Sequence, residues 1–253
     1  QVPFSSINFG TDTSPEGRMV IKNYLLSVDA GLGKNETPIF PISIFKLKKG
    51  VNYEKEDPNY DLFKLACKVS AKRLFPNFSF IDAPHNIIYY KPDDYNTEIS
   101  YMGCRTRVMT DVTDLNNQTT GGRGNLSFTT INLPRLGIKY GICQKTREKA
   151  DMDGFYAELG ERMELVRDQL LERFEVQCNK RVYNFPFLLA QGVWTDGDKL
   201  KPTDRLRKIL KHGTLTIGFI GLAESLKALI VKHHCESEEA QKLGLESIKF
   251  MRK

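Results

Sequence analysis

The sequence has no long hydrophobic run and no secretory signal. No apolar stretch approaches the roughly 20 residues that a membrane-spanning helix needs, and the first residues do not form a charged segment followed by an apolar one. We therefore expect a cytoplasmic protein with no membrane partner.

Cysteine is sparse, and its spacing is irregular. The 253 residues contain five cysteines, and none of them forms a Cys-x-x-Cys pair. An odd, scattered set argues against both a disulfide framework and a structural zinc site. His233, His234 and Cys235 are adjacent, but neighbouring residues on a helix point in different directions. We expect no metal site in this chain.

Signatures of nucleic-acid and phosphate-loop binding are also missing. The formal net charge of +6 suits a protein that handles anions such as nucleotides. However, no basic run is interleaved with aromatic residues, so no nucleic-acid partner is expected. The turn at 31–35, Gly-Leu-Gly-Lys-Asn, lacks the Gly-Lys-Ser/Thr ending of a phosphate-binding loop and is interpreted as a connector.

The chain instead alternates strand and helix patterns, which predicts an α/β fold with largely parallel strands. Because the chain has no initiator methionine and ends within a helical pattern, we expect one incomplete unit. Strands are predicted at 2–9, 38–45, 78–81, 126–133 and 214–221, and helices at about 60–74, 152–179, 203–213, from 222 and at 238–251.

Several residues in these patterns carry specific expectations. In the first strand, Ser6 and Asn8 share one face, and Ile7 and Phe9 share the other. In a barrel, one of these faces would line the interior.

Further along the chain, Cys67 is expected to pack beside a helix core, and His212 to mark a helix end. Gly218 and Gly221 favour tight strand-to-helix packing over phosphate binding, because their spacing is not that of the dinucleotide fingerprint.

Cys104 follows Gly103 between two strand-like runs. Glycine permits a tight loop there, which would expose the sulfur. Arg105 and Arg107 are positive neighbours that favour a thiolate. Radical chemistry does not need a thiolate, and an isolated Gly-Cys pair is more often an ordinary buried cysteine. Local sequence therefore leaves the role of Cys104 open.

Four longer segments carry a family resemblance, and they lie at 3–12, 101–107, 122–134 and 216–224. In this order they resemble segments of the anaerobic, class III ribonucleoside-triphosphate reductases. The resemblance implies the ten-stranded α/β barrel of the glycyl-radical-enzyme and ribonucleotide-reductase type, with the radical cysteine on a central finger loop. Residues 1–253 would then form a partial catalytic barrel domain that includes the finger.

The resemblance also implies a thiyl-radical reduction of ribonucleoside triphosphates to deoxyribonucleoside triphosphates. A glycyl radical would oxidise Cys104, which would take the 3′ hydrogen of the ribose, and formate would supply the electrons. Asn125 would bind the ribose hydroxyls, although by spacing alone it is a turn residue after Gly124. Ser6, Asn8 and Gly103 would line the substrate site.

The implied partners are an activating enzyme, which carries S-adenosylmethionine and an iron-sulfur cluster, and a second copy in a full-length homodimer. This sequence departs from the family in lacking the Arg-Val-x-Gly-Tyr glycyl-radical segment, the cysteine-rich C-terminal zinc region and the N-terminal ATP cone. It also lacks the family's second active-site cysteine and a glycine-rich phosphate loop after the last helix. We therefore expect this chain alone to be inactive.

Two alternatives stay open at this point. A pyruvate formate-lyase-like glycyl radical enzyme shares the barrel but typically carries paired cysteines on its finger, whereas Cys104 stands alone. A non-catalytic nucleotide-binding or assembly module is the other alternative.

Overall fold

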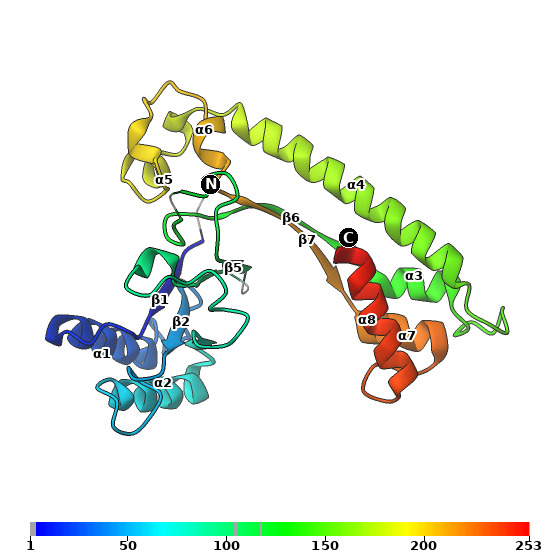
Figure 1. The fold of residues 1–253 in the computed structure, drawn as a ribbon, viewed down its shortest axis with the longest axis horizontal. Helices are drawn as coiled ribbons and strands as arrows, with labels where there is room; N and C mark the ends of the chain where they lie inside the picture. Colours follow the sequence, from blue (N-terminus) through cyan, green and yellow to red (C-terminus); the bar gives the residue numbers. More distant parts are fainter. Residues whose placement is uncertain (1–3, 104–105, 117, 253) are drawn as a thin grey trace. The chain divides into compact units, whose positions relative to one another are not determined.

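The computed structural model describes residues 4–103, 106–116 and 118–252. They form two compact units (Figure 1). The first unit comprises Gln1–Gly124 and Phe185–Lys201, and the second comprises Asn125–Asn184 and Pro202–Lys253.

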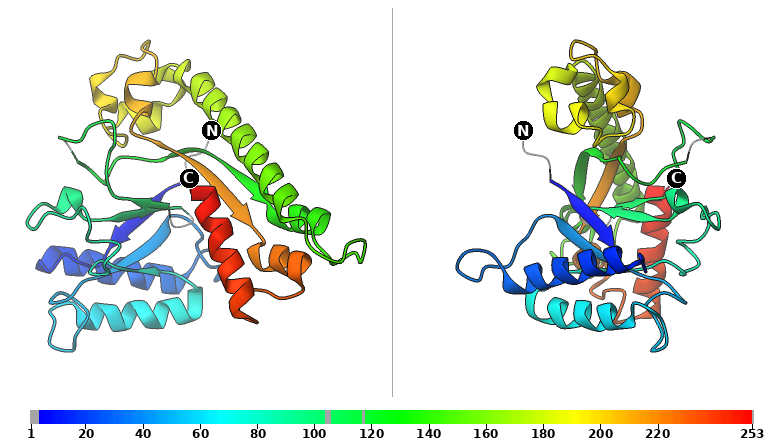
Figure 2. Two further views of the ribbon diagram at one scale, coloured as in Figure 1. Left: turned by 45° about the vertical axis from the view of Figure 1, so that its right-hand side comes forward. Right: turned by 90° about the vertical axis from the view of Figure 1, so that its left-hand side faces the viewer.

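The first unit is built on a three-stranded parallel sheet with the order β1-β2-β3. Parallel neighbours need a crossover connection, and helices α1 and α2 provide it. Both helices pack against the sheet and against each other, as the two views of Figure 2 show. The elements are β1 (Ser6–Phe9), α1 (Pro15–Ala30), β2 (Ile42–Leu47), α2 (Tyr60–Arg73) and β3 (Asn77–Phe80).

Helix α1 has clear start and stop signals. The side chain of Ser14 accepts a hydrogen bond from the Gly17 amide at 3.0 Å, and Pro15 occupies the first turn, where its missing N–H costs nothing. Gly31 ends the helix with a positive φ of 79°, which glycine adopts without strain. This helix was not among those predicted from the sequence.

Phe45 lies at the centre of the first unit's core. Its side chain is 0% exposed, and its ring centroid lies 5.5 Å from that of Phe9 and 6.1 Å from that of Phe78. Side chains alternate along a strand, so Phe45 and Leu47 face the helices while Lys46 faces the opposite side of the sheet. Phe9 joins this core, which confirms that it lies on the face opposite Ser6 and Asn8.

A short antiparallel hairpin, β4–β5, follows the sheet in the first unit. The chain returns to this unit at Phe185–Lys201, a segment that contains Trp194, which is 8% exposed. A Cβ on Gly124 would lie 2.7 Å from the Trp194 ring, so a glycine is needed there. The elements are η1 (Tyr95–Thr97), β4 (Ser100–Met102), β5 (Thr106–Val108), α5 (Pro186–Ala190) and η3 (Gly197–Lys199).

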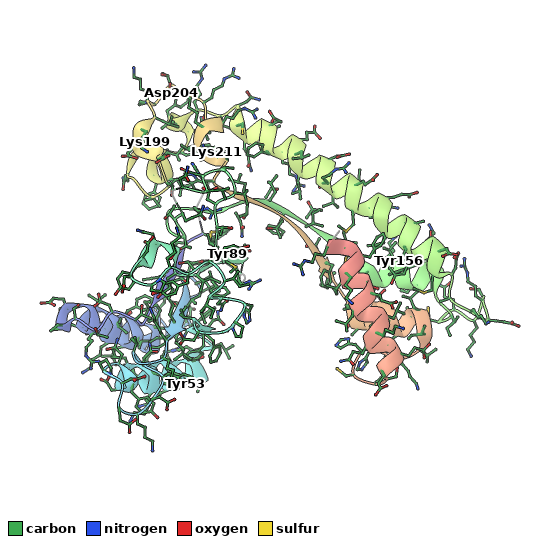
Figure 3. All side chains as sticks on the ribbon, in the orientation of Figure 1. Tyr53, Tyr89, Tyr156, Lys199, Asp204 and Lys211 are labelled. Atoms are coloured by element: carbon green, nitrogen blue, oxygen red, sulfur yellow. The ribbon has the colours of Figure 1, made fainter. Side chains whose placement is uncertain are left out.

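The second unit contains a parallel pair of strands, β6 and β7, covered by helices. Helix α8 packs on α4, where the ring centroids of Tyr156 and Phe250 lie 5.1 Å apart; Figure 3 labels Tyr156. The elements are β6 (Asn125–Asn132), α3 (Leu133–Tyr140), α4 (Met152–Cys178), η2 (Val182–Asn184), α6 (Arg207–Leu210), β7 (Thr214–Ile220), α7 (Leu222–Ile230) and α8 (Glu238–Arg252).

Helix α4 follows the predicted range closely, and its apolar stripe forms the core of the second unit. Its C-terminal half also donates hydrogen bonds to β6. Arg173 Nη1 donates to Ser127 Oγ at 3.1 Å, and Gln177 Nε2 donates to the Leu126 carbonyl at 3.0 Å. The stripe residues that are buried in this core are Phe155, Leu159, Val166 and Leu170.

Glycines permit close helix packing in the second unit. A Cβ on Gly141 would lie 2.0 Å from the Ala228 carbonyl oxygen, and one on Gly221 would lie 2.3 Å from Pro134 Cγ. The packing interpretation is therefore confirmed for Gly221. Gly218 is less crowded, because its nearest neighbour, Thr130 Oγ1, is 3.4 Å from the position of a Cβ.

Two local predictions are wrong. The helix expected from about 203 is the single turn α6, because the Pro202 and Asp204 carbonyls accept hydrogen bonds from the Tyr183 and Val182 amides instead. It also ends at Leu210 rather than at 213, and the Gly213 amide donates to the Leu210 carbonyl in the turn that follows. Cys67 is exposed rather than packed.

Candidate functional site

The hairpin around Cys104 is the candidate site. Met102 of β4 pairs with Thr106 of β5 in antiparallel register. Gly103 has a φ of 48°, a left-handed conformation in which glycine is not strained. The strands on both sides of the predicted finger therefore form a hairpin. Cys104 itself lies outside the described residues, so its role stays a prediction.

Side chains of β1 hold the hairpin backbone. The Gly103 amide donates to Ser6 Oγ at 2.7 Å. The Tyr101 amide donates to Asn8 Oδ1 at 2.9 Å, and Asn8 Nδ2 donates to the Tyr101 carbonyl, also at 2.9 Å. A carboxamide offers both an acceptor and a donor, so Asn8 pairs with Tyr101 as a neighbouring backbone would.

The sequence-predicted residues Ser6, Asn8 and Gly103 are thus brought together in one place. Ser6 and Asn8 occupy alternate positions on β1 and therefore share a face. Their partners, Gly103 and Tyr101, occur in the reverse order along the chain, so β4 crosses β1 in the opposite direction. The contacts of Ser6 and Asn8 seen here are with the hairpin backbone, and a substrate-lining role stays a prediction.

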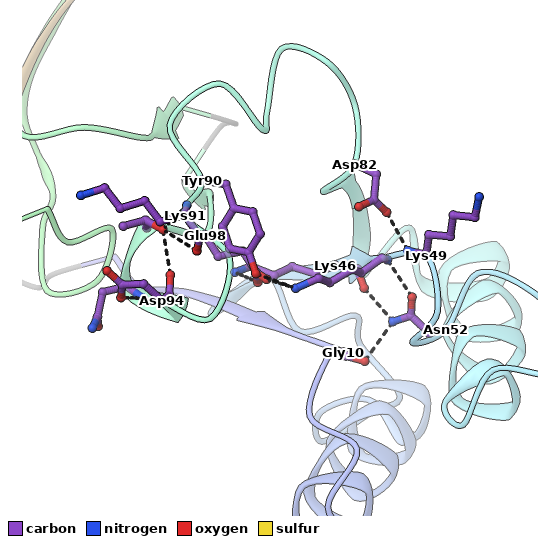
Figure 4. A network of polar contacts seen from close by, with 12 residues as sticks. Gly10, Lys46, Lys49, Asn52, Asp82, Tyr90, Lys91, Asp94 and Glu98 are labelled. Atoms are coloured by element: carbon purple, nitrogen blue, oxygen red, sulfur yellow. Dashed lines mark hydrogen bonds and ion pairs between the residues drawn. The ribbon is translucent and has the colours of Figure 1, made fainter.

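A buried ionic cluster of Lys46, Lys48 and Glu98 lies on the face of the sheet opposite the helices (Figure 4). Lys46 Nζ is 2.8 Å from one carboxylate oxygen of Glu98, and Lys48 Nζ is 3.1 Å from the other. Lys48 also donates to the Tyr90 hydroxyl at 3.2 Å. The Glu98 carbonyl accepts from Thr120 Oγ1 at 2.7 Å. Glu98 precedes β4, so the cluster anchors the entry to the hairpin.

The two lysines keep Glu98 ionised. Burial raises the pKa of Glu98, but attraction to Lys46 and hydrogen bonds from Lys46 and Lys48 outweigh it, so the net pKa lies below the usual value. Burial lowers the pKa of Lys48, yet its contacts with Tyr90 and Glu98 leave that pKa raised overall. Sequence reasoning missed this cluster, and its only signal was a lysine within the apolar run of β2.

The hairpin also contacts the segment that follows β3. The Tyr101 hydroxyl donates to Asn86 Oδ1 at 3.2 Å, and Asn86 Nδ2 donates to the Phe80 carbonyl at 2.7 Å. On β5, Arg107 donates to the His85 carbonyl at 3.2 Å. The hairpin is therefore held at its entry, along β4 and at β5.

Asn125 lies in the second unit, where it begins β6. Its side chain is exposed, and its Oδ1 accepts a hydrogen bond from Thr214 Oγ1. The ribose-binding role expected for Asn125 stays a prediction.

Within residues 4–103, 106–116 and 118–252, no group of three or more His, Cys, Asp or Glu side chains is arranged to hold a metal ion. His233 uses Nδ1 to accept from the Cys235 amide at 3.1 Å, and its Nε2 lies 3.3 Å from Glu236 Oε1. Burial raises the pKa of Cys178, which disfavours its thiolate. No helix in the described part of the chain is long and apolar enough to span a membrane.

Comparison with known proteins identifies relatives along the whole chain. The model of a family described as anaerobic ribonucleoside-triphosphate reductase matches residues 1–253. Proteins of that name from Haemophilus influenzae and Escherichia coli are 29% and 30% identical, over 99% and 100% of this chain and 33% and 34% of their own lengths. One from Enterobacteria phage T4 is 33% identical over 88% of this chain and 36% of its own length. The chain thus spans roughly a third of these relatives.

Proposed function

The chain belongs to the anaerobic ribonucleoside-triphosphate reductase family, and we propose that it is the part of such an enzyme that carries the hydrogen-abstracting cysteine. The complete protein would reduce ribonucleoside triphosphates to 2′-deoxyribonucleoside triphosphates. One observation carries the proposal. The hairpin that flanks Cys104 is held against the polar face of a parallel sheet by Ser6 and Asn8.

In this proposal, Cys104 supplies the reacting sulfur. Cys104 would give its thiol hydrogen atom to a glycyl radical elsewhere in the protein. The Cys104 sulfur would then take the 3′ hydrogen of the ribose, and the 2′ hydroxyl would take up a proton and leave as water. Formate would be oxidised to carbon dioxide and supply two electrons and a proton to the sugar, and the thiol would return a hydrogen atom to C3′. Asn125 would hold the ribose hydroxyls, because its carboxamide can both donate and accept.

The proposal extends to the fold. The mixed α/β units with parallel strands would be portions of the ten-stranded barrel, and the β4–β5 hairpin would be its finger loop. Exposed apolar side chains on β6 and β7 support further coverage of these strands in the complete protein. They include Phe128, Phe219 and Ile220, which are 69%, 44% and 63% exposed.

ATP binding, radical formation and zinc binding would belong to parts of the complete protein outside residues 1–253. These parts are the ATP cone, the glycyl-radical segment and the zinc region. The complete protein would form a cytoplasmic homodimer. It would be activated by an enzyme carrying an iron-sulfur cluster and S-adenosylmethionine.

The test is Cys104→Ala in the full-length, anaerobically activated protein. The glycyl radical should still form, as measured by electron paramagnetic resonance, but deoxynucleotide production should be abolished. Cys143→Ala is the matched control, because Cys143 is an exposed thiol of the second unit, and it should retain turnover. Substantial reduction by the Cys104→Ala protein would rule the assignment out.

A further inference from the structure

We propose that Asn8, supported by Ser6, is a positioning residue that sets where the hairpin presents Cys104. The inference deepens the proposed function and rests on it. The proposed reaction names the reacting cysteine but not the residues that hold its loop. This inference gives that role to Asn8 and Ser6 of β1.

The hairpin needs such an anchor because it is small. β4 and β5 are each 3 residues long, and no backbone ladder joins them to the β1-β2-β3 sheet in the described chain. An isolated two-stranded hairpin is marginally stable in water. Side-chain contacts must therefore supply the order that a ladder would normally give.

Asn8 is suited to this role because its own backbone is fixed. Asn8 pairs with Ile44 of β2, which is 2% exposed, and the helices α1 and α2 cover the other face of this sheet. The carboxamide then makes two hydrogen bonds to the single residue Tyr101, both at 2.9 Å. Two bonds to one residue, one to its amide and one to its carbonyl, fix its direction as well as its distance.

Ser6 adds a second fixed point closer to Cys104. Its hydroxyl oxygen accepts from the amide of Gly103, the residue immediately before the cysteine. Because side chains alternate along a strand, a slip of β4 by one residue would reverse the faces of the hairpin. Ser6 and Asn8 together oppose that slip, since their spacing on β1 matches that of Gly103 and Tyr101 on β4.

The geometry predicts a catalytic effect distinct from instability. A misplacement of about 1 Å at a reacting group costs on the order of 100-fold in rate. Removing the carboxamide should therefore lower kcat by that order while nucleotide KM changes little. The glycyl radical should persist, because it would form on a segment outside residues 1–253.

The experiment uses the full-length activated enzyme with Asn8→Ala and Ser6→Ala. The matched controls are Asn59→Ala and Ser43→Ala. Asn59 is a fully buried asparagine that holds Gly10 and Asp12, and Ser43 contacts Tyr24 on the helix face. Neither control residue has a hydrogen bond to β4 among those described, so each should lose stability without a matching loss of kcat.

Three measurements are made: kcat and KM, the glycyl-radical signal, and hydrogen exchange at the Tyr101 amide. We expect Asn8→Ala to lose on the order of 100-fold in kcat, to keep the radical and to exchange the Tyr101 amide faster than the wild type. Unchanged exchange at Tyr101, wild-type kcat, loss of the radical, or an equal kcat loss in Asn59→Ala would overturn the positioning role. If the wild type makes no Cys104-dependent product, the proposed function fails, while the exchange measurement still tests the anchor.

Discussion

Replacing Glu98 with glutamine should strongly destabilise the first unit. Glu98 is 3% exposed, and its carboxylate neutralises Lys46 and Lys48. Glutamine keeps the shape but leaves both ammonium groups without a counter-charge. Lys46 cannot easily reach water, because its side chain is only 10% exposed. Removing one partner of a buried pair costs about 3–5 kcal/mol.

The companion substitutions should follow an order set by burial. Lys46→Met should cost less than Glu98→Gln, because Lys48 still pairs with the carboxylate. Lys48→Met should cost least, since the Lys48 side chain is 20% exposed and Lys46 remains. The double variant Glu98→Gln/Lys46→Met should recover part of the loss, because it removes the more buried ammonium group, while Lys48, whose side chain is 20% exposed, can reach water.

The assay is urea unfolding followed by tryptophan fluorescence. The chain has a single tryptophan, Trp194, which is buried in the first unit and therefore reports on it. With a slope of about 2 kcal/mol per molar urea, Glu98→Gln should lower the midpoint by roughly 1.5–2.5 M near neutral pH. A shift below roughly 0.5 M, or a double variant as unstable as the sum of the single ones, would refute the reasoning.

The other predictions concern the second unit. Hydrogen bonds from Lys139, Arg162 and Tyr140 lower the pKa of Glu158 from 4.5 to about 2. The stability that the Glu158 carboxylate contributes should thus be present above pH 4.5 and be lost as the pH falls toward 2. Thermal unfolding followed by circular dichroism should show a melting temperature that depends less on pH in Glu158→Gln than in the wild type. Gly221→Ala should cost about 1–3 kcal/mol, because φ is 75° and a Cβ would meet Pro134. Gly218→Ala should change stability far less; equal losses in urea unfolding would contradict the packing argument.

The sequence predicted several helices and strands correctly because the spacing of their own apolar residues and glycines identifies them. The stripe in α4 and the glycine-ended strand β7 needed no knowledge of distant residues. Helix α1 was also accessible from sequence, since Ser14, Pro15 and Gly31 mark both of its ends. The start of α6 was not accessible, because carbonyls at Pro202 and Asp204 bond to amides of a remote segment.

The candidate site shows why residue patterns indicate only half of such contacts. Ser6 and Asn8 are polar residues on one strand face, which the sequence shows directly. Their partners are the backbone groups of Gly103 and Tyr101, and a backbone amide leaves no signal in residue type. The contact therefore requires a carboxamide at position 8. At position 101 it requires only the backbone amide and carbonyl, whatever the side chain. Only the resemblance to a finger loop could bring the two segments together before the structure did.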